Sequence, residues 1–214
     1  MEDGYYKNYF CVSHLDLKNR DRVWRVLCSF LQKKYIAEDS VILDLGAGYG
    51  SFINNIKAGE KYALDKNPII KERAAPGVRT FVQDCTNLKT FEDNFFDVVF
   101  ASNLLEHLER SEIEKTIVET KRVLKNGGKL ILIQPNFTYT YKDYFDDYTH
   151  KQIFTHTSLA DLLRAFGFKI ISVQPKFMPY TMRSKLPTYS WLVKLYLLLP
   201  FKPFAGQMLI VAQK

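Results

Sequence analysis

Three glycines stand on alternate positions directly after an acid in the segment VILDLGAGYG, residues 41–50. The apolar residues predict a buried strand, and Gly46, Gly48 and Gly50 predict a tight turn whose backbone approaches a ligand closely. A dinucleotide pyrophosphate is held by the spacing G-x-G-x-x-G at the start of a helix. The spacing here is G-x-G-x-G, and Asp44 lies just before it. An acid in this place repels phosphate and suits a ligand that carries an ammonium group.

Two further acids follow predicted strands and are candidates for a nucleoside site. Asp65 lies 21 residues after Asp44, at the end of a strand over 62–64, where a carboxylate can accept hydrogen bonds from both hydroxyls of a ribose. Asp84 follows a strand over 78–82, where a carboxylate can accept from the exocyclic amine of adenine. Each acid has an alternative role as a turn residue. Adenosine with an ammonium group and no phosphate points to S-adenosylmethionine, which also carries a sulfonium.

The predicted elements place these residues at one edge of a sheet. Strands are expected over 41–45, 62–64, 78–82, 97–101, 130–133, 168–173 and 208–212, and helices over 20–35, 50–57, 111–125 and 158–166. Ser111 and Ser158 are the expected N-caps of the last two helices. The alternation predicts an α/β fold with a doubly wound, mostly parallel sheet, which binds ligands at the carboxyl ends of its strands.

Residues 40–135 resemble the class I S-adenosylmethionine-dependent methyltransferases, in particular their type 11-like group. The similar segments are the first motif at 41–50, the acidic strand end at 62–65, the adenine-side loop at 83–85, the fourth motif at 96–108 and the fifth at 123–133. The resemblance implies a seven-stranded Rossmann-like sheet whose last strand, here 208–212, runs antiparallel between the fifth and sixth.

The resemblance also implies where the cofactor S-adenosylmethionine lies. The glycine turn holds the methionine end, Asp65 holds the ribose, and Asp84 with the Cys85 amide holds the adenine. Asn103 and Leu104 flank the sulfonium. The full set of cofactor-binding candidates is Asp44, Gly46, Ala47, Gly48, Gly50, Asp65, Lys66, Asp84, Cys85, Asn103 and Leu104.

Methyl transfer from a sulfonium is an in-line displacement, so holding two reactants in place supplies much of the rate, while a hydroxyl acceptor also needs a base. His107, just after the fourth predicted strand, is the first candidate; the alternative is that it only shapes the pocket, since Glu-His-Leu is common in the family. Asp147 and His150 are the second candidates. Their segment resembles methyltransferases encoded with glycan and lipopolysaccharide assembly enzymes; the alternative is a polar loop in which His150 caps or packs.

Composition bounds the class of protein. The 214 residues suit a single methyltransferase domain. Three cysteines without paired spacing fit neither a disulfide framework nor a metal knuckle, so a reducing compartment and no metal are expected. The first ten residues do not have the pattern of a signal peptide, and no apolar run approaches the roughly 20 residues of a membrane span. The expected localisation is cytoplasmic.

The C-terminal quarter is basic. Residues 162–214 hold eight Lys or Arg and no acid, which accounts for the whole net charge of +7. An insertion is expected over 176–206, and the apolar run inside it suggests a peripheral membrane contact through 185–204 or a grip on a lipid-linked acceptor; burial under the sheet and a dimer contact are the alternatives. At the other end, residues 1–35 are the expected helical lid over the cofactor, with Tyr5, Tyr6, Tyr9 and His14 as its notable side chains.

The predicted function is S-adenosylmethionine-dependent O-methylation of a small or glycan-like hydroxyl acceptor, in glycan or lipopolysaccharide biosynthesis. A quinone-type O-methyltransferase is one alternative. An RNA methyltransferase using the basic tail is another, although the Asn-Pro-Pro-Tyr signature of base N-methylation is absent. A binding module without catalysis is disfavoured by the intact acids and glycines. A short-chain dehydrogenase is excluded, because the required Tyr-x-x-x-Lys spacing occurs only at Tyr62 and Lys66, in the second strand.

Overall fold

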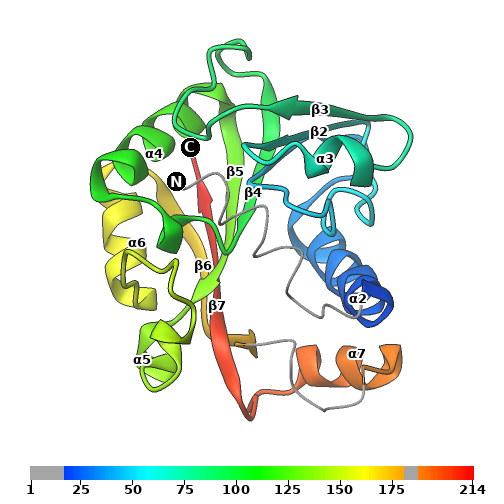
Figure 1. Ribbon diagram of the computed structural model, residues 1–214, viewed down its shortest axis with the longest axis vertical. Coiled ribbons are helices and arrows are strands. Elements are labelled where there is room, and N and C mark those ends of the chain that lie inside the picture. Colours follow the sequence, from blue (N-terminus) through cyan, green and yellow to red (C-terminus); the bar gives the residue numbers. More distant parts are fainter. Residues whose placement is uncertain (1–16, 181–187) are drawn as a thin grey trace.

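The computed structural model describes residues 17–180 and 188–214, which form a seven-stranded sheet flanked by helices (Figure 1). The strands are β1 (Val41–Leu45), β2 (Glu60–Asp65), β3 (Val78–Val82), β4 (Phe96–Ser102), β5 (Leu124–Pro135), β6 (Lys169–Pro179) and β7 (Ala205–Gln213). The helices are α2 (Leu17–Tyr35), α3 (Ile69–Arg73), α4 (Arg110–Val123), α5 (Phe137–Thr140), α6 (His156–Ala165) and α7 (Ser190–Leu198), with short 3-10 helices η1 (Leu105–His107) and η2 (Tyr144–Asp146).

The strand order is β3-β2-β1-β4-β5-β7-β6. Strands β1 to β5 are parallel to one another, and β7 lies antiparallel between β5 and β6. The predicted fold class and the predicted place of the last strand are therefore confirmed. The chain runs outward from β1 to β3 and then returns to β4 on the other side of β1. The carboxyl ends of β1 and β4 thus form the topological switch point, where doubly wound sheets bind ligands.

Both faces of the sheet are buried, and strand residues alternate between them. On β4, Val98 and Phe100 belong to the core beneath α2, whereas Val99 and Ala101 belong to the core beneath α4 and α6. A slip of one residue would exchange the two faces, so packing on both sides fixes the register of the strands. The side chain of Asp44 on β1 follows the same alternation and points toward the α2 side.

The predicted helix over 50–57 is a run of hydrogen-bonded turns in the structure. The amide of Asn55 donates to the carbonyl of Phe52, only three residues back, and its side chain donates to the carbonyl of Ser51 at 3.0 Å. An Asn side chain that competes for backbone groups disfavours a regular helix. Packing anchors the segment instead: Phe52 stacks on Phe100 of β4, with 3.7 Å between ring centroids.

The predicted N-caps of α4 and α6 are wrong by two or three residues. The side chain of Glu112 accepts from the Glu109 amide at 2.7 Å, so α4 begins before Ser111. Thr155 caps α6, because its hydroxyl accepts from the Ser158 amide at 3.1 Å. Overlapping capping-box patterns occur in both segments, and the acceptor further upstream is the one used.

The sequence predicts particular bounds and roles for the N-terminal segment and for the connection between β6 and β7. Tyr5, Tyr6, Tyr9 and His14 of the expected lid lie outside the described residues, while α2 packs against the sheet through Leu27 and Leu31. The connection between β6 and β7 is shorter than the expected 176–206, because β6 runs to Pro179 and β7 begins at Ala205.

Helix α7, in the connection between β6 and β7, packs on α2 and buries Leu197, but its Trp191 side chain is 64% exposed. Burial of the whole run under the sheet is therefore wrong. Among the helices of the described ranges, none has the length and apolar character to cross a membrane.

Candidate active site

The glycine turn follows β1 at the switch point, and its backbone requires glycine. Gly46, Gly48 and Gly50 have positive φ angles of 73°, 52° and 70°, in the left-handed region that disfavours other residues. A Cβ atom on Gly46 would also lie 2.9 Å from Cδ1 of Leu104, in the loop after β4. The amides of Gly46 and Ala47 both donate to the Leu64 carbonyl, at 2.8 and 3.1 Å, and so tie the turn to the end of β2.

Asp44 lies beneath this turn, with only 3% of its surface exposed. Burial raises the pKa of its carboxyl to about 8, and the neighbouring Asp65 adds to the shift. The Ile53 amide donates to the carboxyl and Arg20 lies close to it, and both oppose the rise. A carboxyl in this state would gain from a cationic ligand, because an ammonium group offsets the cost of burying the charge.

Asp65 ends β2 and faces the glycine turn. Its Oδ2 accepts from the Gly48 amide and its Oδ1 accepts from the Asn67 amide, both at 2.7 Å. Burial raises the pKa of Asp65, while these two hydrogen bonds lower it. The structure thus brings Asp44, Asp65 and the turn together as predicted. Lys66, the next residue, has an exposed side chain.

Asp84 and Cys85 follow β3 with contrasting surroundings. Asp84 is exposed, and its Oδ1 accepts from the Thr86 amide at 2.8 Å, which is the turn role given above as its alternative. The Cys85 thiol is buried 3.6 Å from the Thr116 hydroxyl, and burial raises its pKa to about 11. This thiol is therefore a packing group, and only the backbone of Cys85 is suited to contact a ligand.

Asn103 follows β4 in a strained backbone conformation. Its φ is +49°, which is uncommon outside glycine and is tolerated best by Asn and Asp. The Asn103 amide donates to the Ile133 carbonyl at 2.9 Å, and its side-chain oxygen accepts from Gln207 of β7 at 3.2 Å. Strain of this kind concentrates at functional sites. The sequence alone did not indicate the contact with Gln207, which depends on the antiparallel last strand.

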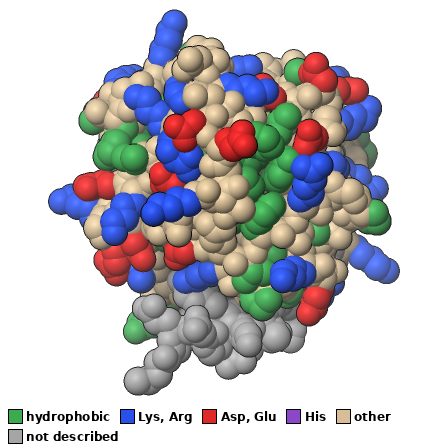
Figure 2. Space-filling view, turned by 90° about the horizontal axis from the view of Figure 1, so that it is seen from above, with side chains coloured by type: hydrophobic (Ala, Val, Ile, Leu, Met, Phe, Trp, Pro, Cys, Tyr) green, Lys and Arg blue, Asp and Glu red, His purple; other side chains and the backbone are tan. Residues whose placement is uncertain are grey.

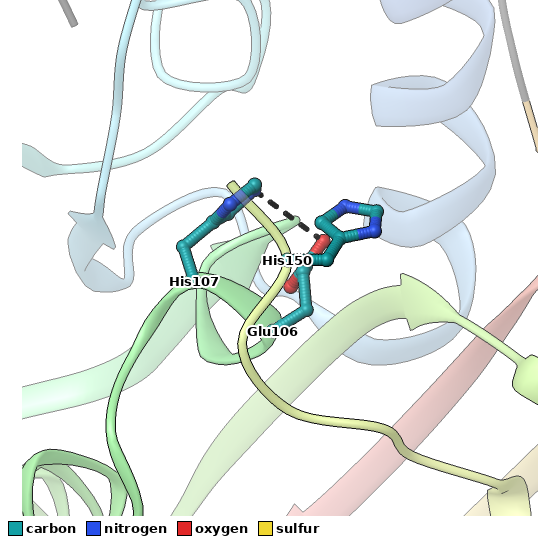
Figure 3. A group of neighbouring side chains, drawn as sticks. All are labelled: Glu106, His107 and His150. Carbon is teal, nitrogen blue, oxygen red and sulfur yellow. Dashed lines mark ion pairs between the residues drawn. The ribbon is translucent and has the colours of Figure 1, made fainter. Parts of the chain in front are cut away.

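Glu106, His107 and His150 form a cluster (Figure 3), and the first two belong to η1, which directly follows Leu104. The ring centroids of the two histidines are 5.0 Å apart, and Nε2 of His107 lies 3.9 Å from Oε1 of Glu106. The Glu106 carbonyl accepts from the amides of Lys151 and Gln152, at 2.7 and 3.1 Å. These bonds hold the loop that carries His150 against η1.

Hydrogen bonds define the proton positions on both imidazoles. The Thr149 hydroxyl donates to Oδ1 of Asp147 at 2.5 Å, so toward Nδ1 of His107, 2.8 Å away, it can only accept. Nδ1 of His150 lies 2.7 Å from the Tyr144 carbonyl, which also can only accept. Both imidazoles therefore carry their proton on Nδ1 and a lone pair on Nε2.

Burial favours the neutral forms in this cluster. It lowers the pKa of His107 to about 4, with His150 and Lys66 as further causes, while the nearby Asp147 opposes the shift. It raises the pKa of Glu106 to about 8, and the negative charge of Asp147 adds to this. The 3.9 Å approach of Glu106 and His107 is thus not an ion pair between two charged groups.

The predicted catalytic residues are close together, but Asp147 does not touch His107. Asp147 acts on it through Thr149, and Oδ2 of Asp147 lies 4.0 Å from Nε2 of His150. Sequence reasoning missed Glu106 as a member of the cluster, although a single acid in the apolar run LLEHL was a usable signal. It also missed Thr149 and the Tyr144 carbonyl, because backbone groups and hydroxyls brought together by a loop leave no pattern in the sequence.

Two surface hollows lie away from this site. One of about 500 Å³ is lined by Lys18, Asp21, Arg22, Arg25 and Ser190, and another of about 230 Å³ lies at the amino ends of β1 and β4. At the glycine turn, the Asp65 carboxylate bonds to Gly48 and the Leu104 side chain covers Gly46. The site is defined by the side chains at the carboxyl ends of the strands.

Comparison with known proteins agrees with this assignment. A methyltransferase-domain family profile matches residues 43–132, from β1 into β5. An uncharacterized protein of Methanocaldococcus jannaschii is 34% identical over 147 residues, which are 67% of this chain and 61% of that protein. Phosphoethanolamine N-methyltransferase 1 of Triticum aestivum is 32% identical over 133 residues, which are 58% of this chain and 25% of its own length. The chain thus spans less than two thirds of the length of either relative.

The fold has close counterparts among solved structures. An S-adenosylmethionine-dependent methyltransferase from Archaeoglobus fulgidus superposes with a TM-score of 0.67 over 89% of this chain and 94% of its own, at 19% identity. Identity at this level shows a shared fold. The family profile and the glycine turn after β1 identify residues 43–132 as a methyltransferase domain, and the fold is that of the class I S-adenosylmethionine-dependent methyltransferases.

Proposed function

We propose that this protein transfers the methyl group of S-adenosylmethionine to a hydroxyl group of a small or glycan-like acceptor. The observation that carries the proposal is the tautomer of His107. Thr149 accepts its Nδ1–H, so its Nε2 has a free lone pair. His107 is three residues after Leu104, whose side chain covers the glycine turn. A hydroxyl acceptor needs a group that takes its proton as the methyl group arrives, and a neutral imidazole with a fixed tautomer suits that role.

The cofactor would lie across the carboxyl ends of β1, β2 and β4. Asp44 would meet the ammonium group through the turn, and Asp65 would exchange its bonds to backbone amides for the ribose hydroxyls. Asp84 with the Cys85 amide would hold the adenine, and Asn103 with Leu104 would flank the sulfonium.

The proton of the acceptor would move to Nε2 of His107. Protonation there costs free energy, because burial depresses the pKa of the imidazole. The Glu106 carboxyl, 3.9 Å from Nε2, would stabilise the imidazolium once it forms, and Asp147 would do so through Thr149. In-line alignment of the sulfonium methyl with the acceptor oxygen supplies the remainder of the rate.

Three other acceptors are alternatives: an amine, an RNA and a quinone-type hydroxyl. The amine is suggested by a relative named for N-methylation of phosphoethanolamine, and a neutral amine attacks through its lone pair without first losing a proton. An RNA acceptor would need a surface on which Lys and Arg side chains gather without acids between them. Arg122 is paired with Asp93 and Glu119 at 2.7 and 2.8 Å, and on the face seen in Figure 2, Lys and Arg side chains are interspersed with Asp and Glu. The mixed charges of this face do not favour binding of a nucleic acid. A quinone-type hydroxyl is compatible with the site.

We propose further that α7 and the loop after it contact a membrane surface or hold a lipid-linked acceptor. Trp191, Leu198, Phe201 and Phe204 are 64, 74, 70 and 80% exposed. Lys194 is exposed on the same helix, and no acid occurs in residues 162–214. Exposed aromatic and aliphatic side chains with basic neighbours bind anionic interfaces by apolar insertion and charge attraction together.

The test is a methyl-transfer assay that measures formation of S-adenosylhomocysteine over a panel of acceptors: sugars, quinols, amines and structured RNA. We expect turnover with a hydroxyl acceptor, at least a hundredfold slower in His107→Ala, while the variant binds S-adenosylmethionine as the wild type does. His156→Ala, which removes a histidine outside the cluster, is the matched control. Turnover with amines alone, unchanged by His107→Ala, would refute the proposal.

A further inference from the structure

Glu106 is buried in surroundings that give its carboxylate no hydrogen-bond donor among the described residues. The residue is 1% exposed, and neither carboxylate oxygen has a hydrogen-bond partner among residues 17–180 and 188–214. Buried polar atoms are nearly always paired, and a carboxylate left without a donor is costly. The side chain needs either a proton of its own or a positive partner.

The neighbours of Glu106 supply lone pairs rather than protons. Both imidazoles keep their proton on Nδ1, held by Thr149 and by the Tyr144 carbonyl, so neither Nε2 can donate to the carboxylate. One donor atom each from Glu106, His107 and His150 lies within 4.8 Å of the other two (Figure 3). With Glu106 ionised, three acceptor groups share this space, and together they form a site for a cation.

We propose that Glu106, His107 and His150 bind a divalent transition-metal ion. Two imidazoles and one carboxylate are a donor set for Zn²⁺ and its neighbours, whereas Mg²⁺ and Ca²⁺ prefer oxygen ligands alone. Three protein ligands leave at least one coordination position open to a further group. Ligand bonds of about 2 Å would require the side chains to move inward from their present separations.

The surrounding hydrogen bonds are those of a supported metal site. Ligating histidines usually donate their other ring proton to a carbonyl or to a group linked to a carboxylate. His150 donates to the Tyr144 carbonyl, and His107 donates to Thr149, which in turn donates to Asp147. The loop carrying His150 is fastened to the Glu106 carbonyl through the amides of Lys151 and Gln152. The three ligands are thus held in relation to one another before an ion arrives.

This inference departs from the expectation of no metal, which rested on cysteine spacing. Its catalytic consequence rests on the proposed function: a bound ion would lower the pKa of an acceptor hydroxyl in its open position, and His107 would then act as a ligand rather than as the base. Ion binding itself does not depend on that function.

The test uses the full chain, freed of metal by chelation and titrated with Co²⁺, Zn²⁺ and Mg²⁺. We expect one Co²⁺ or Zn²⁺ per chain, a visible Co²⁺ spectrum and no comparable binding of Mg²⁺. Glu106→Gln and His150→Gln should each weaken Co²⁺ binding at least tenfold, while the exposed control Glu114→Gln should not change it. Circular dichroism shows whether each variant folds, and either variant suffices if the other does not fold. Absence of stoichiometric binding, or binding that neither variant weakens, would overturn the proposal.

Parallel measurements separate this inference from the proposed function. Methyl transfer by chelated protein that matches the metal-loaded rate would overturn the catalytic role of the ion and leave His107 as the base. Stoichiometric Co²⁺ binding that needs Glu106, with no S-adenosylmethionine binding, would support the metal site and overturn the proposed function instead.

Discussion

Replacement of Asp44 by Asn should make the protein more stable at high pH and weaken its hold on the cofactor. In the folded protein burial raises the pKa of Asp44 from 3.8 to about 8, so between these values the folded chain holds a proton that the unfolded chain has lost. The associated stability is fully present below pH 3.8 and is lost as the pH rises toward 8. The slope is ~1.4 kcal/mol per pH unit for one proton, which gives an upper limit of about 6 kcal/mol. Relaxation and water penetration reduce that limit to a few kcal/mol.

The assay is urea unfolding of wild type and Asp44→Asn without ligand at pH 5 and pH 8. The difference between the two proteins isolates Asp44 from other titrating groups. We expect the variant to gain about 2 kcal/mol or more on the wild type between the two pH values. Asp39→Asn, an exposed acid just before β1, is the control and should show no such gain. The variant should also bind S-adenosylmethionine at least tenfold more weakly, because the ammonium group loses its buried counter-charge.

Two results would refute this reasoning about Asp44. A stability difference that does not change with pH would mean that the carboxyl is ionised throughout. Unchanged cofactor affinity in Asp44→Asn would mean that the acid does not face the ligand.

Three further predictions concern the turn, the strained residue and α7. Gly46→Ala should abolish cofactor binding, because alanine is strained at φ +73° and its methyl group would displace the Leu104 side chain, 2.9 Å away; calorimetry with S-adenosylmethionine checks this, and binding like that of wild type would contradict it. Asn103→Gly should be about 1 kcal/mol more stable than Asn103→Ala in urea unfolding, because alanine carries the cost of φ +49°, and equal midpoints would argue against strain there. Trp191→Glu should reduce sedimentation with vesicles containing phosphatidylglycerol at least fivefold relative to wild type, and equal sedimentation would remove α7 from the contact.

Much of the fold could be predicted because its strands are buried on both faces. The predicted strands over 97–101 and 130–133 are apolar apart from Asp97, and they lie within β4 and β5. The sequence predicts a helix over 50–57 where the structure has turns. The apolar spacing there does not show that the Asn55 side chain competes for the Ser51 carbonyl. The strand extensions of β6 and β7 depend on pairing with each other, which local sequence does not encode.

For the site, sequence reasoning predicted the positions of residues that follow strand ends or stand at the spaced glycines. Asp44, Asp65 and the turn lie together as the spacing predicts. Sequence reasoning did not single out Glu106, because what distinguishes this residue is the absence of hydrogen-bond donors around its buried carboxylate among the described residues. Only the structure shows that the imidazole protons point away from a buried carboxylate.

The central claim is that the carboxyl ends of β1, β2 and β4 bind S-adenosylmethionine. Isothermal titration calorimetry of the full chain with S-adenosylmethionine tests it most directly, with Asp65→Ala as the variant and the exposed Asp39→Asn as the control. We expect one molecule bound per chain, the same affinity in the control, and binding at least a hundredfold weaker in Asp65→Ala, since the ribose hydroxyls lose a charged acceptor. Absence of binding to the wild type, or binding that Asp65→Ala does not weaken, would contradict it.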